Sequence, residues 1–219
     1  MGGPVSVVRR ERASSAERRL AVSIRRAERR ATTRRKLLEA AAKIIGRHGF
    51  NGCSIARVTS RARVAHGTFY LYFKSQQEMF DQILPTLGGE MLVSIVAAVG
   101  HEMNPVEVER LGFTANTRYI VENPFMNRVT YEAHLFTPKV YATYIDDIIE
   151  KYVRSFRRTI KHGRLANAGD EELRLIARMI VSARETLLLQ LTSENLKDPG
   201  FLDRLVENYL GFVKGGLDI

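Results

Sequence analysis

Apolar residues recur at helical spacing along most of the chain. The first clear stripe predicts a helix over about residues 33–48 and consists of Leu37, Leu38, Ala41, Ala42, Ile44 and Ile45. Gly49 follows this stripe and is expected to end the helix in a left-handed conformation. Ser54 is then an expected N-cap, because its hydroxyl can accept a free backbone N–H, and a second helix of roughly two turns follows it.

A third, shorter helix is predicted over residues 67–73, whose sequence is Gly-Thr-Phe-Tyr-Leu-Tyr-Phe. A helix this small buries little surface, so we expect its residues to be chosen for what they touch. Two short helices joined by three or four residues and braced by a longer one have the layout of a helix-turn-helix DNA reader. The second of the two would enter the major groove.

The remainder of the chain also has helical patterning, without the sustained alternation of a sheet. A long helix is expected over about 75–99, kinked or broken at Pro85 or at Gly88 and Gly89. No apolar run approaches the roughly 20 residues of a membrane span. The predicted fold is all-α, with a basic arm (1–31, disordered or helical on DNA), a helix-turn-helix domain (32–80) and a larger helical domain for effector binding and dimerisation (81–219).

An ordered series of motifs resembles the N-terminal domain of TetR-family transcriptional regulators. The motifs are Gly49-Phe50, Cys53-Ser54-Ile55, Ala62-Arg63-Val64-Ala65, Gly67-Thr68-Phe69-Tyr70, Tyr72-Phe73-Lys74-Ser75 and Glu78-Met79-Phe80. The resemblance covers about a quarter of the chain. It implies a homodimer, a palindromic operator and a small-molecule effector held in the C-terminal domain.

Three positions depart from the family pattern. Arg63 replaces the usual turn glycine, so a residue with a side chain is expected in a left-handed conformation there. Ala65 replaces a serine, and Gln76 replaces a lysine that commonly contacts phosphate. These departures make the operator sequence unpredictable by analogy.

Candidate DNA contacts follow from the resemblance and from residue chemistry. Ser54 and Tyr72 are assigned to phosphates, Thr68 to a phosphate or a thymine methyl group, and His66 and Tyr70 to base edges, while Gly67 permits close approach. The full set is Arg34, Arg35, Ser54, Arg57, Ala65, His66, Gly67, Thr68, Tyr70, Tyr72, Lys74 and Gln76. Phe69 and Phe73 are expected to hold the recognition helix in place.

Positive charge is concentrated at the N-terminus. Residues 1–36 contain twelve Arg or Lys and three Glu, a net +9 of the total +10. Such an arm can neutralise phosphates or enter a minor groove. A stripe of Ala16, Leu20, Ile24, Ala27 and Ala31 is compatible with a helix over about 14–30. A disordered, solubilising tail remains the alternative, and a membrane-surface helix is disfavoured because the stripe has no aromatic anchor.

Enzymatic signatures are missing from the sequence. There is no phosphate-binding loop and no zinc-protease motif, and the five histidines are scattered. The single cysteine, Cys53, excludes an intrachain disulfide and is expected to be a small packed residue. Residues 1–12 lack the apolar core of a signal peptide. We therefore expect a cytoplasmic protein that is not an enzyme and needs no cofactor or metal.

Half of the eighteen aromatic residues fall between residues 113 and 156. Such side chains, with a few polar groups, line small-molecule pockets, although each single ring is also a normal core residue. The predicted effector contacts are Phe113, Arg118, Tyr119, Tyr131, His134, Leu135, Tyr141 and Tyr144. Asn127 is a further polar candidate.

The last two apolar segments, 171–193 and 201–213, suggest a four-helix dimer interface. The predicted dimer contacts are Ile176, Ile180, Leu187, Leu191, Leu205 and Tyr209. Together these features predict a homodimeric repressor that a hydrophobic or aromatic effector releases from a palindromic operator. Two alternatives remain: an architectural DNA binder that uses the basic arm, and a helical small-molecule-binding or enzymatic protein with a vestigial DNA domain.

Overall fold

The computed structural model describes residues 5–217, and it describes the side chains of residues 17–163 and 165–216. This part of the chain contains helices and no strand, which confirms the all-α prediction. The α-helices are α1 (Val5–His48), α2 (Ile55–Ala62), α3 (Gln76–Ile83), α4 (Gly89–Val99), α5 (Pro105–Glu122), α6 (Phe125–Phe136), α7 (Pro138–Thr159), α8 (Asp170–Leu188) and α9 (Phe201–Leu217). The short segments are the 3₁₀ helices η1 (Phe50–Gly52), η2 (His66–Leu71), η4 (Arg164–Asn167) and η5 (Asn195–Lys197) and the π-helix η3 (Leu84–Gly88).

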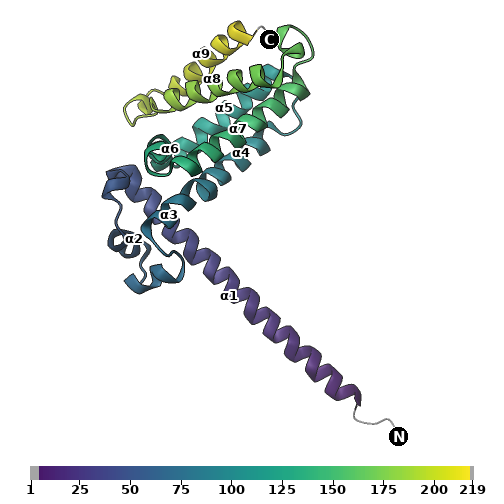
Figure 1. The fold of residues 1–219 in the computed structure, drawn as a ribbon, viewed down its shortest axis with the longest axis vertical. Coiled ribbons are helices and arrows are strands. Elements are labelled where there is room, and N and C mark those ends of the chain that lie inside the picture. The colour runs from purple at the N-terminus through teal and green to yellow at the C-terminus, as the bar shows by residue number, and fades with distance from the viewer. Residues whose placement is uncertain (1–4, 218–219) are drawn as a thin grey trace.

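Helix α1 is much longer than predicted. It ends at His48 as expected but begins at Val5 rather than near residue 33, so the basic arm continues the first helix of the DNA domain without a break. Figure 1 shows the N-terminal half of α1 as a rod that projects away from the rest of the molecule. The side chains of residues 17–32 are exposed, whereas the predicted stripe from Leu37 to Ile45 is buried. The predicted charges at Arg9, Arg10 and Arg12 lie outside the described side chains.

Local caps fix the helix-turn-helix. The Ser54 hydroxyl accepts the Arg57 backbone N–H at 3.3 Å, which confirms it as the N-cap of α2. Arg63 has φ 57° and ψ 47°, so the left-handed conformation expected at this residue is present. Gly49 has φ 70°, as its role at the end of α1 requires, but its ψ of 173° is extended rather than helical.

The predicted fourth helix consists of α3, η3 and α4 in one continuous run. The π-turn includes Pro85 and Gly88, which agrees with the expected distortion. The run Gln76–Val99 is long and apolar enough, by length and composition alone, to cross a membrane, so the expectation that no such run exists was wrong. Its sequence meets this criterion because Glu90 is the only charged residue between positions 82 and 99. Here α3 packs against α1, and α4 packs along α5.

Helix α6 joins the DNA-binding region to the larger helical domain. It packs closely along α1, so that a Cβ added at Gly46 would lie 2.5 Å from the Phe125 Cβ. The Phe50 ring stacks on Phe136 with centroids 4.8 Å apart. The Phe50 backbone N–H also donates to Glu132 at 3.1 Å. These contacts give the two regions a direct, tightly packed junction.

Candidate nucleic-acid interface and ligand cavity

Two buried phenylalanines hold η2 on the DNA-binding region. Phe69 is 0% and Phe73 1% exposed, and their ring centroids are 5.4 Å apart. The Arg34 guanidinium lies over the Phe73 ring at 5.5 Å. This arrangement matches the anchoring role expected of both aromatic residues, and it leaves the opposite side of η2 free.

The free side of η2 presents a mixed polar and aromatic surface. His66, Gly67 and Tyr70 are exposed, and the His66 and Tyr70 rings meet edge to face with centroids 6.0 Å apart. Thr68 is half-buried beside them. Leu71 is 70% exposed, a position that sequence reasoning passed over although an apolar side chain here can reach a thymine methyl group.

The residues flanking η2 have several roles within the fold. Gln76 is half-buried and donates from its side-chain amide to the Cys53 carbonyl at 2.8 Å, while Arg57 donates to the Gly52 carbonyl at 2.9 Å. Ser54, Ala65 and Lys74 are exposed and Tyr72 is half-buried. Ala65 makes no side-chain cap, as its lack of a hydroxyl requires.

Cys53 is a packed residue. It is 1% exposed, and burial raises the pKa of its thiol to about 12, so the reactive thiolate is suppressed. Arg35, another predicted DNA contact, pairs with Glu39 at 2.9 Å and with Glu90 at 3.0 Å. The second pair connects α1 to the start of α4. Among the described side chains, no group of three or more His, Cys, Asp or Glu is placed to hold a metal ion.

A cavity of about 520 Å³ lies between α4, α5, α7 and α8, with α6 at one end. Its walls are mainly aliphatic, from residues including Leu92, Ile95, Val99, Val108, Ile120 and Ile148. The exposed lining residues at the α4 and α7 sides are Val96, Gly100, Lys151 and Arg154. A cavity of this size and character suits a small hydrophobic molecule.

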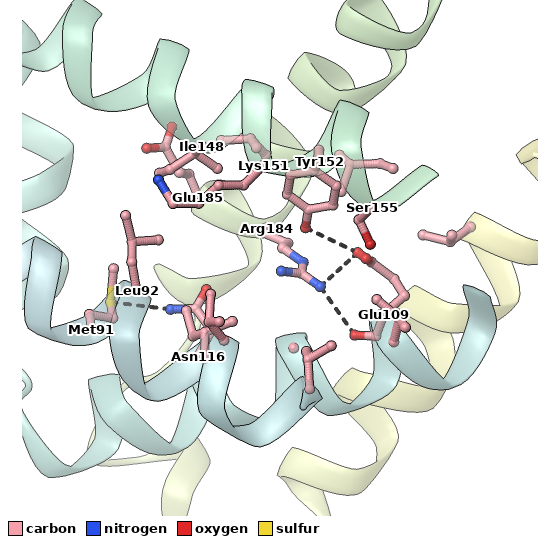
Figure 2. A pocket seen from close by; sticks show the side chains of 18 of the residues that line it. Met91, Leu92, Glu109, Asn116, Ile148, Lys151, Tyr152, Ser155, Arg184 and Glu185 are labelled. Atoms are coloured by element: carbon pink, nitrogen blue, oxygen red, sulfur yellow. Dashed lines mark hydrogen bonds and ion pairs between the residues drawn. The ribbon is translucent and has the colours of Figure 1, made fainter. Parts of the chain in front are cut away.

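One wall of the cavity carries a buried ionic cluster, shown in Figure 2. Arg184 of α8 donates to the Glu109 carboxylate of α5 at 2.7 Å and to the Glu109 backbone carbonyl at 3.1 Å. Tyr152 of α7 donates to the same carboxylate at 3.3 Å, and Tyr209 of α9 donates to it as well. Arg184 also lies over the rings of Phe113, Tyr152 and Tyr209 at 5.2 to 5.5 Å. Burial opposes the charge on Arg184, but Glu109, Tyr152 and Tyr209 together outweigh it, and the pKa of Arg184 lies above its ordinary range.

A second carboxylate, Glu185, lies on the cavity wall near α6. Burial raises its pKa, and the hydroxyl of Tyr141 donates to it at 3.2 Å. Burial also raises the pKa of Tyr141 to about 12 and that of Tyr144 above its ordinary range. Both tyrosines therefore keep their protons and act as hydrogen-bond donors at neutral pH.

The predicted effector residues are divided between the cavity and other places. Tyr131 and Tyr144 line the cavity, and Tyr141 reaches it through Glu185. Phe113 lies in the core behind Arg184, and Tyr119 donates to the Leu87 carbonyl at 3.3 Å. Arg118, His134 and Leu135 are exposed and do not line it. Sequence reasoning missed the polar lining residues Glu109, Asn116, Lys151, Arg154, Arg158, Arg184 and Glu185.

The predicted dimer residues also divide. Ile176, Ile180 and Tyr209 are buried inside the subunit, whereas Leu187, Leu191 and Leu205 are half-exposed. Leu187 and Leu205 line a groove between α8 and α9. Beside them, Leu175 and Met179 of α8 and Phe212 of α9 are 56%, 65% and 67% exposed. The outward apolar face therefore uses partly different residues of the same two helices.

Comparison with known families gives a match at the DNA-binding region. Residues 37–83 match the family described as "Bacterial regulatory proteins, tetR family". Two relatives from Bacillus subtilis (strain 168), the uncharacterized HTH-type transcriptional regulators YhgD and YvdT, are 42% and 38% identical over 59 and 52 residues. These alignments cover 26% and 24% of this chain and 31% and 27% of the relatives, so they span less than a third of either relative.

Solved structures resemble nearly the whole fold. A TetR-like transcriptional regulator from Rhodococcus sp. RHA1 matches with a TM-score of 0.66 and 19% identity, over 86% of this chain and 97% of that one. The fatty acid degradation regulator FadR from Bacillus halodurans matches with 0.66 and 18%, over 84% and 96%. The ketosteroid transcriptional regulator KstR2 of Mycobacterium tuberculosis matches with 0.60 and 19%, over 84% and 93%. At these identities the similarity concerns the fold.

Proposed function

We propose that this chain, which belongs to the TetR family of transcriptional regulators, is a homodimeric repressor that a small hydrophobic molecule releases from a palindromic operator. Regulators of this family bind DNA and are not enzymes. The observation that supports the proposal is the junction of α1 and α6, because it packs the region that contains the exposed segment η2 directly against the domain that contains an apolar cavity of about 520 Å³.

The DNA contacts that we propose use the exposed side of η2. His66 and Tyr70 face base edges, Thr68 meets a phosphate or a thymine methyl group, and Gly67 allows the backbone to approach. Ser54, Tyr72 and Lys74 contact phosphates on either side. The Ser54 oxygen caps α2, but its hydroxyl hydrogen remains available as a donor to a phosphate.

Release is proposed to pass from the cavity through α6. Asn127, Thr130 and Tyr131 of α6 line the cavity, while Phe125 and Phe136 of the same helix pack on α1 and η1. A ligand that prefers one position of α6 shifts the population toward dimers whose recognition helices are wrongly spaced. The related structures named for fatty acid degradation and for ketosteroids are consistent with a hydrophobic effector.

The test is a gel-shift assay on the DNA upstream of the chain's own gene. The variant His66→Ala/Tyr72→Ala should lose roughly 1–3 kcal/mol of operator binding for each side chain truncated, together with selectivity over random DNA. The control is His101→Ala/His162→Ala, which changes two exposed histidines outside the DNA-binding region. Urea unfolding of both variants shows whether the half-buried Tyr72 also matters for stability. Unchanged affinity and selectivity in a folded His66/Tyr72 variant would refute the proposed interface.

The second candidate function is that of an architectural DNA-binding protein that uses the exposed basic helix. Replacing Arg25, Arg26, Arg29 and Arg30 with Gln should reduce the slope of log affinity against log salt by about 0.9 for every phosphate that the helix no longer neutralises. A specific repressor retains its preference for the operator in this variant. An architectural protein has equal affinity for operator and random DNA before the change and loses both together.

A further inference from the structure

The cavity contains more positive than negative charge. Six charged side chains line the cavity. Four are cationic (Lys151, Arg154, Arg158 and Arg184) and two are anionic (Glu109 and Glu185). Glu109 and Arg184 neutralise each other, and two tyrosines donate to the same Glu109 oxygen, Oε1, that pairs with Arg184. Glu185 accepts a hydrogen bond from Tyr141 and forms no ion pair with a cation of the cavity within the described side chains. Three cations of α7 therefore line the cavity without an ion-pair partner among the described side chains.

These three cations, Lys151, Arg154 and Arg158, form one row on α7. Their spacing of three and four residues places them along a single helix face. None of them has a carboxylate of the described residues within 4.0 Å. By contrast, Arg157, on another face of α7, pairs with Asp170 at 2.7 Å, and the acidic residues Asp146 and Glu150 of α7 pair with arginines of α8. Ion pairing thus covers the outer surface of α7 and stops at the cavity.

Arg158 gives a second, independent indication that the cavity binds a molecule with an acceptor oxygen. Its Nε is buried and has no hydrogen-bond partner within the described part of the chain. A buried donor of this kind is uncommon in folded proteins, because leaving it unpaired costs free energy. Since Arg158 lines the cavity, a bound molecule with an acceptor oxygen can satisfy it.

We propose that the effector is an amphiphilic anion, with an apolar tail and a carboxylate or phosphate head group. This inference rests on the proposed function and narrows its ligand class. The tail lies against the aliphatic side chains of α4 and α5, among them Ile95 and Val108. The head group lies on the α7 row, where Lys151 and Arg154 are exposed and the Arg158 Nε is buried without a hydrogen-bond partner among the described residues. The closed Glu109–Arg184 pair leaves no free charge deeper in the cavity to attract the head group.

Calorimetric titration of the full-length protein without DNA tests this class directly. The probes share a ten-carbon tail and differ in head group: decanoate, decyl phosphate, decanol and decyltrimethylammonium, each below its micelle concentration. We expect at least one of the anions to bind tenfold or more tightly than decanol, and the cation to bind more weakly still. Comparing decanoate with decyl phosphate identifies the head group. Shortening the tail of the tighter-binding anion should weaken its binding by about fourfold for each methylene removed.

Variants of the α7 row then locate the head group. Lys151→Gln/Arg154→Gln/Arg158→Gln should lower anion affinity about tenfold and leave decanol affinity unchanged, while the outward-facing Arg157→Gln changes neither. If the triple variant fails to fold, Arg158→Gln alone should still lower anion affinity and leave decanol affinity unchanged. Decanol binding as tightly as both anions, no binding of any probe, or anion binding that ignores these substitutions would overturn the inference. Selective anion binding that leaves operator binding intact would instead refute ligand-controlled release and leave this inference standing. If decanol releases the protein from the operator and neither anion does, ligand-controlled release stands and the inference of an anionic effector is refuted.

Discussion

Arg63 is the one non-glycine residue with positive φ among the described residues. It ends α2 in a Schellman-type turn, in which its own N–H bonds to the Ser60 carbonyl and the Val64 N–H to the Thr59 carbonyl at 3.0 Å. The left-handed conformation costs a residue with a Cβ roughly 1–2 kcal/mol. The turn needs this backbone conformation whichever residue occupies it, so the strain at Arg63 is tolerated because the surrounding hydrogen bonds fix the chain.

Replacing Arg63 with Gly should therefore stabilise the protein. The relief of strain exceeds the extra entropy of glycine in the unfolded chain, and we expect a net gain of about 0.5–1 kcal/mol in the free energy of unfolding. Arg61→Gly, two residues earlier and inside α2, should instead destabilise by about 1 kcal/mol. Urea unfolding of both variants measures the expected increase and decrease in the free energy of unfolding. A loss of stability in Arg63→Gly would show that the arginine side chain contributes more than the turn costs.

Glu185 should make stability depend on pH. Its pKa in the folded protein is raised above the ordinary 4.5, chiefly by burial. Below pH 4.5 the residue is protonated in both the folded and the unfolded chain. As pH rises from there through the folded pKa, the unfolded chain releases the proton first, and the stability due to this residue is lost.

The variant Glu185→Gln removes this titration. Relative to the unmodified protein, its free energy of unfolding should increase as pH rises from about 4.5 and level off above the folded pKa. Tyr141→Phe deletes the hydrogen bond that lowers the Glu185 pKa and should extend the affected range to higher pH. Urea midpoints between pH 4 and 8 measure both changes. A pH-independent difference for Glu185→Gln would mean that the carboxyl is more hydrated than its burial indicates.

At the scale of elements, the Glu109–Arg184 cluster connects α5, α7, α8 and α9. Replacing Arg184 with Met should cost about 3–5 kcal/mol, because it leaves the Glu109 carboxylate buried without its cation. The double variant Glu109→Gln/Arg184→Met should recover most of this loss, since the amide oxygen still accepts from Tyr152 and Tyr209. Arg178→Met, which removes an exposed pair with Asp146, should cost no more than about 1 kcal/mol. Chemical denaturation that finds no recovery in the double variant would assign the loss to packing around Arg184 rather than to the stranded charge.

The elements of the DNA-binding region could be predicted because local signals determine them. Ser54 caps α2, the stripe from Leu37 to Ile45 is buried, and Arg63 takes the left-handed turn, all as expected. The predicted start of α1 near residue 33 was wrong by about 28 residues, because the stripe from Ala16 to Ala31 indicated a separate helix over about 14–30 rather than a continuation of the same one. The described side chains of this segment are exposed, so no packing partner marks where one helix would end and the next begin, and the high helix propensity of its Ala and Arg residues continues the helix.

The cavity was harder to predict because its polar groups meet only in three dimensions. Glu109 and Arg184 are 75 residues apart, and each alone looks like an ordinary surface charge in a helix. Aromatic density pointed to α5, α6 and α7, but of the eight predicted residues only Tyr131 and Tyr144 line the cavity. Phe113 packs beneath the cavity wall and Leu135 faces solvent, since aromatic and apolar content does not reveal which side of a helix faces the gap between its neighbours.

At the scale of the whole molecule, the outer apolar face of α8 and α9 is the proposed dimer interface. Leu175, Met179 and Phe212 are each more than half exposed there, and such a cluster on a soluble monomer indicates a partner. An isologous contact across this face gives the two-fold symmetry that a palindromic operator requires. Each subunit then contributes one η2 helix to one half-site.

Met179→Lys should therefore uncouple the subunits without unfolding them. An exposed lysine is harmless on a monomer, but in the interface its charge would be buried against apolar side chains, so sedimentation should show monomers at micromolar concentration. Operator affinity should then fall by a factor on the order of 10²–10⁴, because the second half-site no longer benefits from an attached second subunit. Leu135→Lys, which changes an equally exposed apolar residue on α6, should leave both assembly and DNA binding unchanged. A Met179→Lys protein that remains dimeric with full operator affinity would place the interface on another face of the helical domain.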